Sequence, residues 1–93
     1  MSAGTEATSR PRLERGVRLR EDTVRGGFVL LAPERVLKTN AITVEILKRC
    51  DGERTLGDII DDLARVYAAD RTRIAADVEE LLADLARKRM VAL

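Results

Sequence analysis

The side chains of this sequence that could do acid–base chemistry are two pairs of adjacent carboxylates, Asp61-Asp62 and Glu79-Glu80. Neighbouring residues on a helix point about 100° apart, so the two carboxylates of each pair diverge from any single substrate atom. We therefore expect both pairs to lie on solvated helix faces, and no spacing among the acidic residues demands a metal ion. The sequence predicts no catalytic residue, no bound metal and no cofactor.

The chain has no His and a single Cys among its 93 residues. Without an imidazole it can form neither a Ser-His-Asp nor a Cys-His catalytic set. Cys50 alone can form no internal disulfide, and we expect it to be a small buried apolar residue. Gly26-Gly27 is not followed by the Lys of a phosphate-binding loop and predicts a turn. Tyr67 is expected to pack on the core with its hydroxyl group near the edge.

The N-terminal half predicts three short strands. Val17–Arg20 alternates apolar and basic residues, Phe28–Ala32 is a short apolar run, and Arg35–Lys38 follows a turn that begins at Pro33. Strands joined by short turns form an antiparallel meander. A sheet of this size is not stable alone and needs a layer of helices on its apolar face.

The C-terminal half predicts three helices. Asn40 is an N-cap for a helix running through Cys50, Thr55 and Asp58 form a capping box, and Asp70 can cap the last helix. Apolar residues then recur at helical spacing. They are Ile42, Ile46, Leu47 and Cys50 in the first helix, Leu56, Ile59, Ile60, Leu63 and Tyr67 in the second, and Ile74, Val78, Leu81, Leu82 and Leu85 in the third. The predicted fold class is α+β, a three-stranded antiparallel sheet followed by three helices, winged-helix-like.

The two ends of the chain differ in composition. Residues 1–12 are mostly small and polar and predict a disordered tail or linker, which leaves a single domain over residues 13–93. Met90–Leu93 is apolar and is expected to pack back onto the domain. No apolar run approaches the ~20 residues of a membrane span, and no secretory signal is present, so we expect a cytoplasmic protein without a membrane partner.

Charge argues against nucleic acid as a partner. The net charge is +1; residues 1–49 hold ten basic and six acidic residues, and residues 50–93 hold seven and ten. The third helix would be the reading helix of a winged-helix DNA-binding protein, yet Asp77, Glu79, Glu80 and Asp84 would repel phosphate. With one Tyr and one Phe, the chain has no platform for base stacking.

The third predicted strand, Arg35–Lys38, is of interest because an edge strand leaves main-chain N–H and C=O groups unpaired. Its charged ends are a usual guard against aggregation, and the same free edge could receive a guest peptide as an added strand. It could also pair with a second copy of the chain. Of Val36 and Leu37, one should face the core and the other should not, because side chains alternate along a strand.

The order and spacing of several segments resemble the PqqD family, the peptide chaperones of pyrroloquinoline quinone (PQQ) biosynthesis. The resemblance covers about residues 11–93. It rests on Pro11-Arg12-Leu13, Gly16-Val17-Arg18-Leu19, Val29-Leu30-Leu31-Ala32-Pro33-Glu34, Asn40, Glu45-Ile46-Leu47-Lys48 and Asp51-Gly52.

The resemblance implies a non-catalytic peptide-recognition domain. Family members bind the precursor peptide PqqA and present it to the radical S-adenosylmethionine (SAM) enzyme PqqE. In related domains the peptide pairs with the third strand, in a groove beside the third helix. Carried over to this sequence, the peptide-binding residues are Arg35, Val36, Leu37 and Lys38 of the strand and Arg73, Ala76, Asp77, Glu80, Leu81 and Asp84 of the helix.

Three functional hypotheses follow. The first is a peptide-binding chaperone for PqqA that works with PqqE. The second is a winged-helix DNA-binding protein, which should lose affinity steeply as salt is raised. The third is an enzyme, for which the sequence offers no convergent acid, base, nucleophile or metal set.

Overall fold

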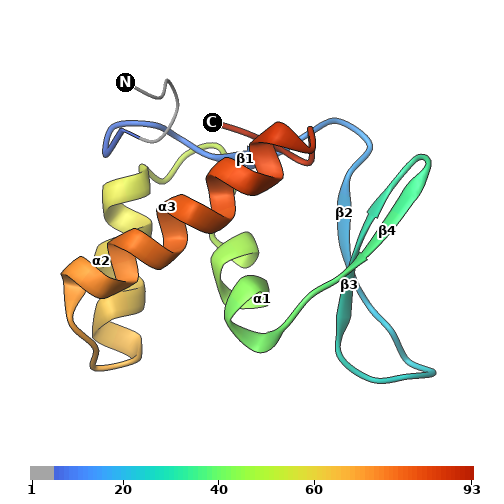
Figure 1. Ribbon diagram of the computed structural model, residues 1–93, viewed down its shortest axis with the longest axis horizontal. Coiled ribbons are helices and arrows are strands. Elements are labelled where there is room, and N and C mark those ends of the chain that lie inside the picture. The colour runs from blue at the N-terminus through green and yellow to red at the C-terminus, as the bar shows by residue number, and fades with distance from the viewer. Residues whose placement is uncertain (1–5) are drawn as a thin grey trace.

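The predicted order of three strands followed by three helices is confirmed in the computed structural model, which describes residues 6–93 (Figure 1). The strands form one antiparallel sheet in the order β2-β3-β4, beside the three helices. These are β2 (Arg18–Glu21), β3 (Phe28–Ala32), β4 (Arg35–Lys38), α1 (Ala41–Lys48), α2 (Leu56–Val66) and α3 (Arg71–Arg87). The α+β fold class is therefore confirmed.

The two ends of the domain meet in a short ribbon that the sequence did not predict. β1 (Arg12–Leu13) pairs antiparallel with β5 (Val91–Ala92), with Leu13 opposite Val91. Met90 and Val91 are buried in the core, so the expectation that the C-terminal residues pack back onto the domain is confirmed. None of the helices within residues 6–93 is long and apolar enough to cross a membrane.

The segment expected to be a tail differs in part from that description. Residues 1–5 lie outside the described residues, but residues 6–12 contact the domain. Pro11 is fully buried, and the carbonyl groups of Ser9 and Ala7 accept hydrogen bonds of 2.7 and 3.0 Å from the N–H groups of Leu56 and Gly57. These N–H groups have no partner inside α2 because they belong to its first turn, which explains why the preceding chain binds there. The domain boundary at residue 13 stays a prediction.

Each helix begins directly after the capping residue that the sequence predicted. The Asn40 side chain accepts a 2.8 Å hydrogen bond from the Thr43 N–H, and the Thr55–Asp58 capping box has both of its hydrogen bonds. Asp70 stands at the N-cap of α3 but makes no side-chain cap bond there. α1 ends at Lys48, two residues before its predicted end, and Cys50 is buried just beyond it.

Most of the core lies among the helices. Its fully buried side chains include Leu56, Ile59 and Leu63 of α2 and Val78 and Leu82 of α3. In the three-stranded sheet only Leu30 is buried, at 1% exposure. The sheet therefore contacts the core through one central residue and the half-buried leucines on either side of it, Leu19 and Leu37.

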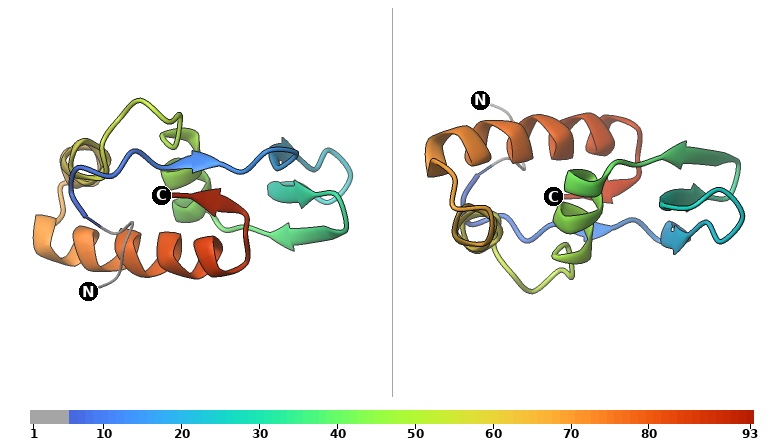
Figure 2. Two further views of the ribbon diagram at one scale, coloured as in Figure 1. Left: turned by 90° about the horizontal axis from the view of Figure 1, so that it is seen from above. Right: turned by 90° about the horizontal axis from the view of Figure 1, so that it is seen from below.

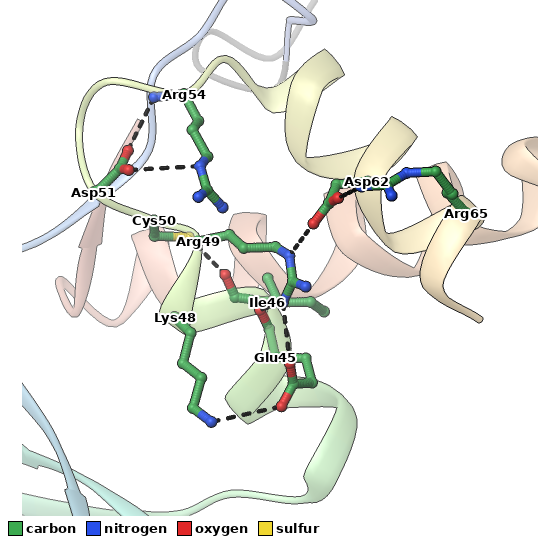
Figure 3. Close-up of polar contacts among 9 residues, drawn as sticks. All are labelled: Glu45, Ile46, Lys48, Arg49, Cys50, Asp51, Arg54, Asp62 and Arg65. Atoms are coloured by element: carbon green, nitrogen blue, oxygen red, sulfur yellow. Dashed lines mark hydrogen bonds and ion pairs between the residues drawn. The ribbon is translucent and has the colours of Figure 1, made fainter.

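An ion-pair cluster joins α1 to α2 (Figure 3). The Arg49 guanidinium donates to Asp62 at 2.6 Å and to the Glu45 carboxylate at 3.0 Å, and Asp62 also pairs with Arg65. Arg49 lowers the pKa values of both Glu45 and Asp62 through these hydrogen bonds. The cluster holds the outer faces of the two helices together.

Candidate functional site

β4 has one open edge. Within residues 6–93 it pairs with β3 alone, with Leu37 opposite Leu30 and Val36 opposite Leu31. The Thr39 N–H donates to the Phe28 carbonyl at 3.3 Å, which fixes the phase of the ladder. Because bonded and non-bonded pairs alternate in an antiparallel ladder, residues 35, 37 and 39 bond to β3. The N–H and C=O groups of Val36 and Lys38 therefore point to the open edge.

The side chains of β4 alternate as expected. Leu37 lies on the inner side and packs partly against the core, in line with Leu30. Val36 lies on the outer side and is 63% exposed. Leu37 is thus the core-facing member of the pair, and Val36 combines an exposed side chain with main-chain groups at the open edge.

β4 and α3 lie on the same side of the molecule, which both views of Figure 2 show. Arg35, the first residue of β4, donates a hydrogen bond to the carbonyl group of Lys88 just after α3, and its guanidinium is 3.8 Å from the Met90 sulfur. This contact ties the start of the edge strand to the C-terminal end of the helix. The other end of β4 leads through Asn40 directly into α1.

The six helix residues carried over from the family resemblance occupy one face of α3, because they recur every three or four residues. The structure brings four of them together around a shallow hollow of about 320 Å³ that Arg87 also lines. Arg73 and Ala76 are exposed on the helix but do not line it. The four residues at the hollow are Asp77, Glu80, Leu81 and Asp84.

The hollow is acidic but partly neutralised. Asp84 pairs with Lys88 at 2.9 Å and with Arg87 at 3.1 Å, and the hydrogen bond from Lys88 lowers the pKa of Asp84. Asp77 and Glu80 form no ion pair with another described residue and are exposed. Two carboxylates on this face are therefore available to a basic group of a bound molecule.

An apolar cleft next to this face was missed by the sequence analysis. It has a volume of about 230 Å³ and lies where α1, the end of α2 and the first half of α3 meet. Two of its residues were expected on the core face of their helices, and the structure shows this to be wrong. Ile42 is 43% exposed and Tyr67 is 41% exposed. The cleft is lined by Asn40, Ile42, Thr43, Ile46, Leu63, Tyr67, Ile74, Asp77, Val78 and Leu81.

A signal for the cleft was present in the sequence. The first helix carries more apolar residues than one face can bury, and the structure buries Val44, Ile46 and Leu47 in the core. Ile42 is left at the rim as the excess apolar side chain. Asp77 and Leu81 line both the cleft and the acidic hollow, so the two depressions form one continuous surface along α3.

The only thiol lies away from this surface. Cys50 is buried, and burial raises its pKa to about 12, so the thiolate that would act as a nucleophile is scarcely populated near neutral pH. The expectation of a small buried residue is confirmed for Cys50. Residues 6–93 contain no group of three or more His, Cys, Asp and Glu side chains placed to hold a metal ion.

These features define a class: a small α+β domain whose sheet has an open edge at β4, beside an apolar cleft and a charged helix face. The model of the PqqD family, described as coenzyme PQQ synthesis protein D, matches residues 27–91. The chain belongs to the PqqD family.

Relatives with similar sequences match most of the chain. The chain is 55% identical to a protein of Rhodopseudomonas palustris (strain HaA2) named "PqqA binding protein", over 86% of this chain and 78% of that protein. It is 44% identical to a protein of the same name from Xanthomonas axonopodis pv. citri, over 98% and 99% of the two chains.

Two solved structures of PqqD proteins also match this chain in fold and sequence. The solution structure of the PqqD truncation of Methylobacterium extorquens PqqCD, described as a functional and stand-alone recognition element for ribosomally made and modified peptides, is 44% identical. It superposes with a TM-score of 0.81 over 95% of this chain and 94% of that chain. The crystal structure of PqqD from Xanthomonas campestris is 41% identical and gives a TM-score of 0.61 over 95% and 98%.

Proposed function

We propose that this protein is a non-catalytic peptide chaperone of PQQ biosynthesis. It binds the ribosomally made precursor peptide PqqA as an added strand on β4 and presents it to the radical SAM enzyme PqqE. Support for the peptide comes from the relatives named "PqqA binding protein". The observation that carries the binding mode is the open edge of β4, where Val36 and Lys38 direct their main-chain groups outward.

Main-chain hydrogen bonds would give the complex its affinity and its register. A peptide strand alongside β4 can exchange N–H and C=O bonds with residues 36 and 38, each bond stabilising the complex by about 0.5–1.5 kcal/mol. These bonds do not depend on the peptide's side chains. Selectivity must therefore come from the surfaces on either side of the edge.

The cleft beside α1 can supply part of that selectivity. Ile42 and Tyr67 stand at its rim, and Leu81 lines both the cleft and the acidic hollow. An apolar side chain of the peptide would fill the cleft and bury both rim residues, which are the kind of exposed apolar groups that mark binding sites. Asp77 and Glu80 would attract a basic residue of the same peptide, and Lys38 and Arg73 an acidic one.

Presentation of the peptide to the enzyme follows from tethering the peptide to the chaperone. A peptide held on the chaperone reaches the enzyme at a high effective concentration when the chaperone also contacts that enzyme. A DNA-binding role is disfavoured by the same surface, because Asp77 and Glu80 are exposed on the helix that would enter the groove.

The experiment compares proline at the two opposite edges of the sheet. Val36→Pro removes an N–H group that points to the open edge of β4, and the ladder to β3 loses no bond. We expect isothermal titration with PqqA peptide to show at least a tenfold loss of affinity, about 1.4 kcal/mol.

Glu21→Pro is the matched control. It makes the same change on β2, the other edge strand, at a residue whose N–H group also points away from β3. It should bind the peptide as the unaltered protein does. Equal loss in both variants, or unchanged binding by a folded Val36→Pro variant, would refute strand addition at β4.

A further inference from the structure

The outer face of the three-stranded sheet carries a second surface, which overlaps the peptide site only at Val36 and Lys38 of β4. The ladder places Leu31 between Arg18 and Val36, and Val29 between Arg20 and Lys38. These six side chains alternate with the inner leucines and so share the face turned away from the core. We call this set the outer sheet face: Arg18, Arg20, Val29, Leu31, Val36 and Lys38.

The charges on the outer sheet face are of one sign and are not compensated within the described chain. Arg18, Arg20 and Lys38 form no ion pair with any residue of 6–93. Every ion-paired cation of that part of the chain lies instead between Lys48 and Lys88, on or next to the helices. Like charges gathered on a small sheet repel one another, so this arrangement opposes folding.

Apolar groups lie between these cations. Val36 is 63% exposed, and Val29 and Leu31 are half-buried. Val29, Val36 and Lys38 line an open hollow of about 550 Å³ that extends to the β2–β3 turn, where Asp22 and Arg25 also line it. An apolar centre within a charged rim is the usual composition of a protein–protein interface.

Nucleic acid fits this face less well than protein does. None of the six side chains is aromatic, so the face has no ring on which a base could stack. The Phe28 ring is engaged by the Lys48 ammonium, which lies 5.4 Å from its centroid. The charge and the apolar centre together favour a folded protein with an acidic patch.

We propose that the outer sheet face binds an acidic patch on the enzyme that modifies the bound peptide. This inference rests on the proposed function and adds the surface through which the enzyme is contacted. A peptide on the edge of β4 extends the sheet in its own plane. The outer face stays open because its side chains project perpendicular to that plane. Peptide and enzyme can therefore be bound together, with the peptide beside the enzyme.

The test reverses two charges of the outer sheet face, in a variant carrying R18E and R20E. The control variant carries R54E and R65E, which change the net charge equally at two exposed residues of the helical half. Three quantities are measured at 50 mM and 300 mM salt: the affinity for PqqA peptide, the affinity of the peptide-loaded chaperone for purified PqqE, and the affinity for a random-sequence DNA duplex.

We expect R18E/R20E to weaken enzyme binding at least tenfold at low salt and to leave peptide affinity within twofold, whereas R54E/R65E changes neither. Added salt should narrow the difference in enzyme affinity between R18E/R20E and the unaltered protein, because screening weakens attraction between exposed charges. If the unaltered protein binds no peptide, the proposed function fails. If it binds the peptide but R18E/R20E binds the enzyme normally, or if DNA is the ligand that depends on Arg18 and Arg20, the present inference fails alone.

Discussion

The helical half and the three-stranded sheet of this small domain are stabilised in different ways. The helices bury most of the core, and an ion-pair cluster around Arg49 joins two of them. The sheet buries Leu30 alone, and its three outer cations form no ion pair with a carboxylate among residues 6–93. The difference indicates a division of roles, in which the helices hold the fold and the sheet offers surface for binding.

The largest effect should come from emptying the helical core. Leu82 is fully buried on α3, and Leu82→Ala should lower the free energy of unfolding by about 2–5 kcal/mol through lost apolar contacts and the cavity left behind. Val36→Ala on the exposed outer side of β4 should change it by less than about 0.5 kcal/mol. Urea unfolding of both variants, followed by circular dichroism, measures the two values. A loss at Val36 as large as at Leu82 would contradict the division of roles.

A smaller effect is expected at two turn glycines. Gly52 and Gly26 both have positive φ, so alanine is strained at either place. At Gly52 the cost should be about 1–3 kcal/mol, since its new Cβ would also lie 3.4 Å from the Arg12 side chain. At Gly26 no atom of the described residues lies within 4 Å of the new Cβ, and the cost should stay near 1 kcal/mol. Thermal unfolding of Gly52→Ala and Gly26→Ala compares a turn packed against Pro11 and Arg12 with one at the open end of the sheet. Equal losses of stability would mean that the Arg12 side chain adds nothing to the cost of alanine at Gly52.

The smallest effect is expected from the ion-pair cluster, and it should depend on pH. Arg49 lowers the pKa of Asp62 in the folded state, so the carboxylate adds stability above its unfolded pKa, and this contribution is lost as the pH falls through the folded pKa. Asp62→Asn should therefore be less stable than the unaltered protein at pH 7, and the two should converge as the solution is acidified below the ordinary Asp range. Urea midpoints at several pH values measure the gap. In an Arg49→Met background the gap should shrink to the smaller part that the exposed Arg65 pair supplies, and a gap that widens in acid would contradict the assignment.

Much of the fold could be predicted because its signals are local. The strand bounds Phe28–Ala32 and Arg35–Lys38 agree with the structure, and the cap at Asn40 and the capping box at Thr55 form as expected. Each of these depends on turn geometry or on hydrogen bonds that reach only a few residues along the chain. The pairing of β1 with β5 escaped prediction because it joins two-residue strands from opposite ends of the sequence, each too short to give a periodic pattern.

The candidate site, like the fold, could be predicted from the sequence only in part. Sequence alone identified an edge strand over residues 35–38 and a charged face on the third helix. It also indicated that only one of Val36 and Leu37 could face the core. It could not say which, because a shift of one residue in register exchanges the two faces of a strand.

Amino-acid order thus determined the succession of strands and helices, the absence of histidine chemistry and the excess of apolar residues in the first helix. Tertiary packing decided where the apolar side chains that do not fit the core lie. It turned Ile42 and Tyr67 toward a shared cleft, aligned β4 with α3 on one side of the molecule, and gathered Arg18, Arg20 and Lys38 on one outer face. The reason is that helical and strand periodicities act over a few residues, whereas a cleft or an exposed face exists only after separate elements have packed together.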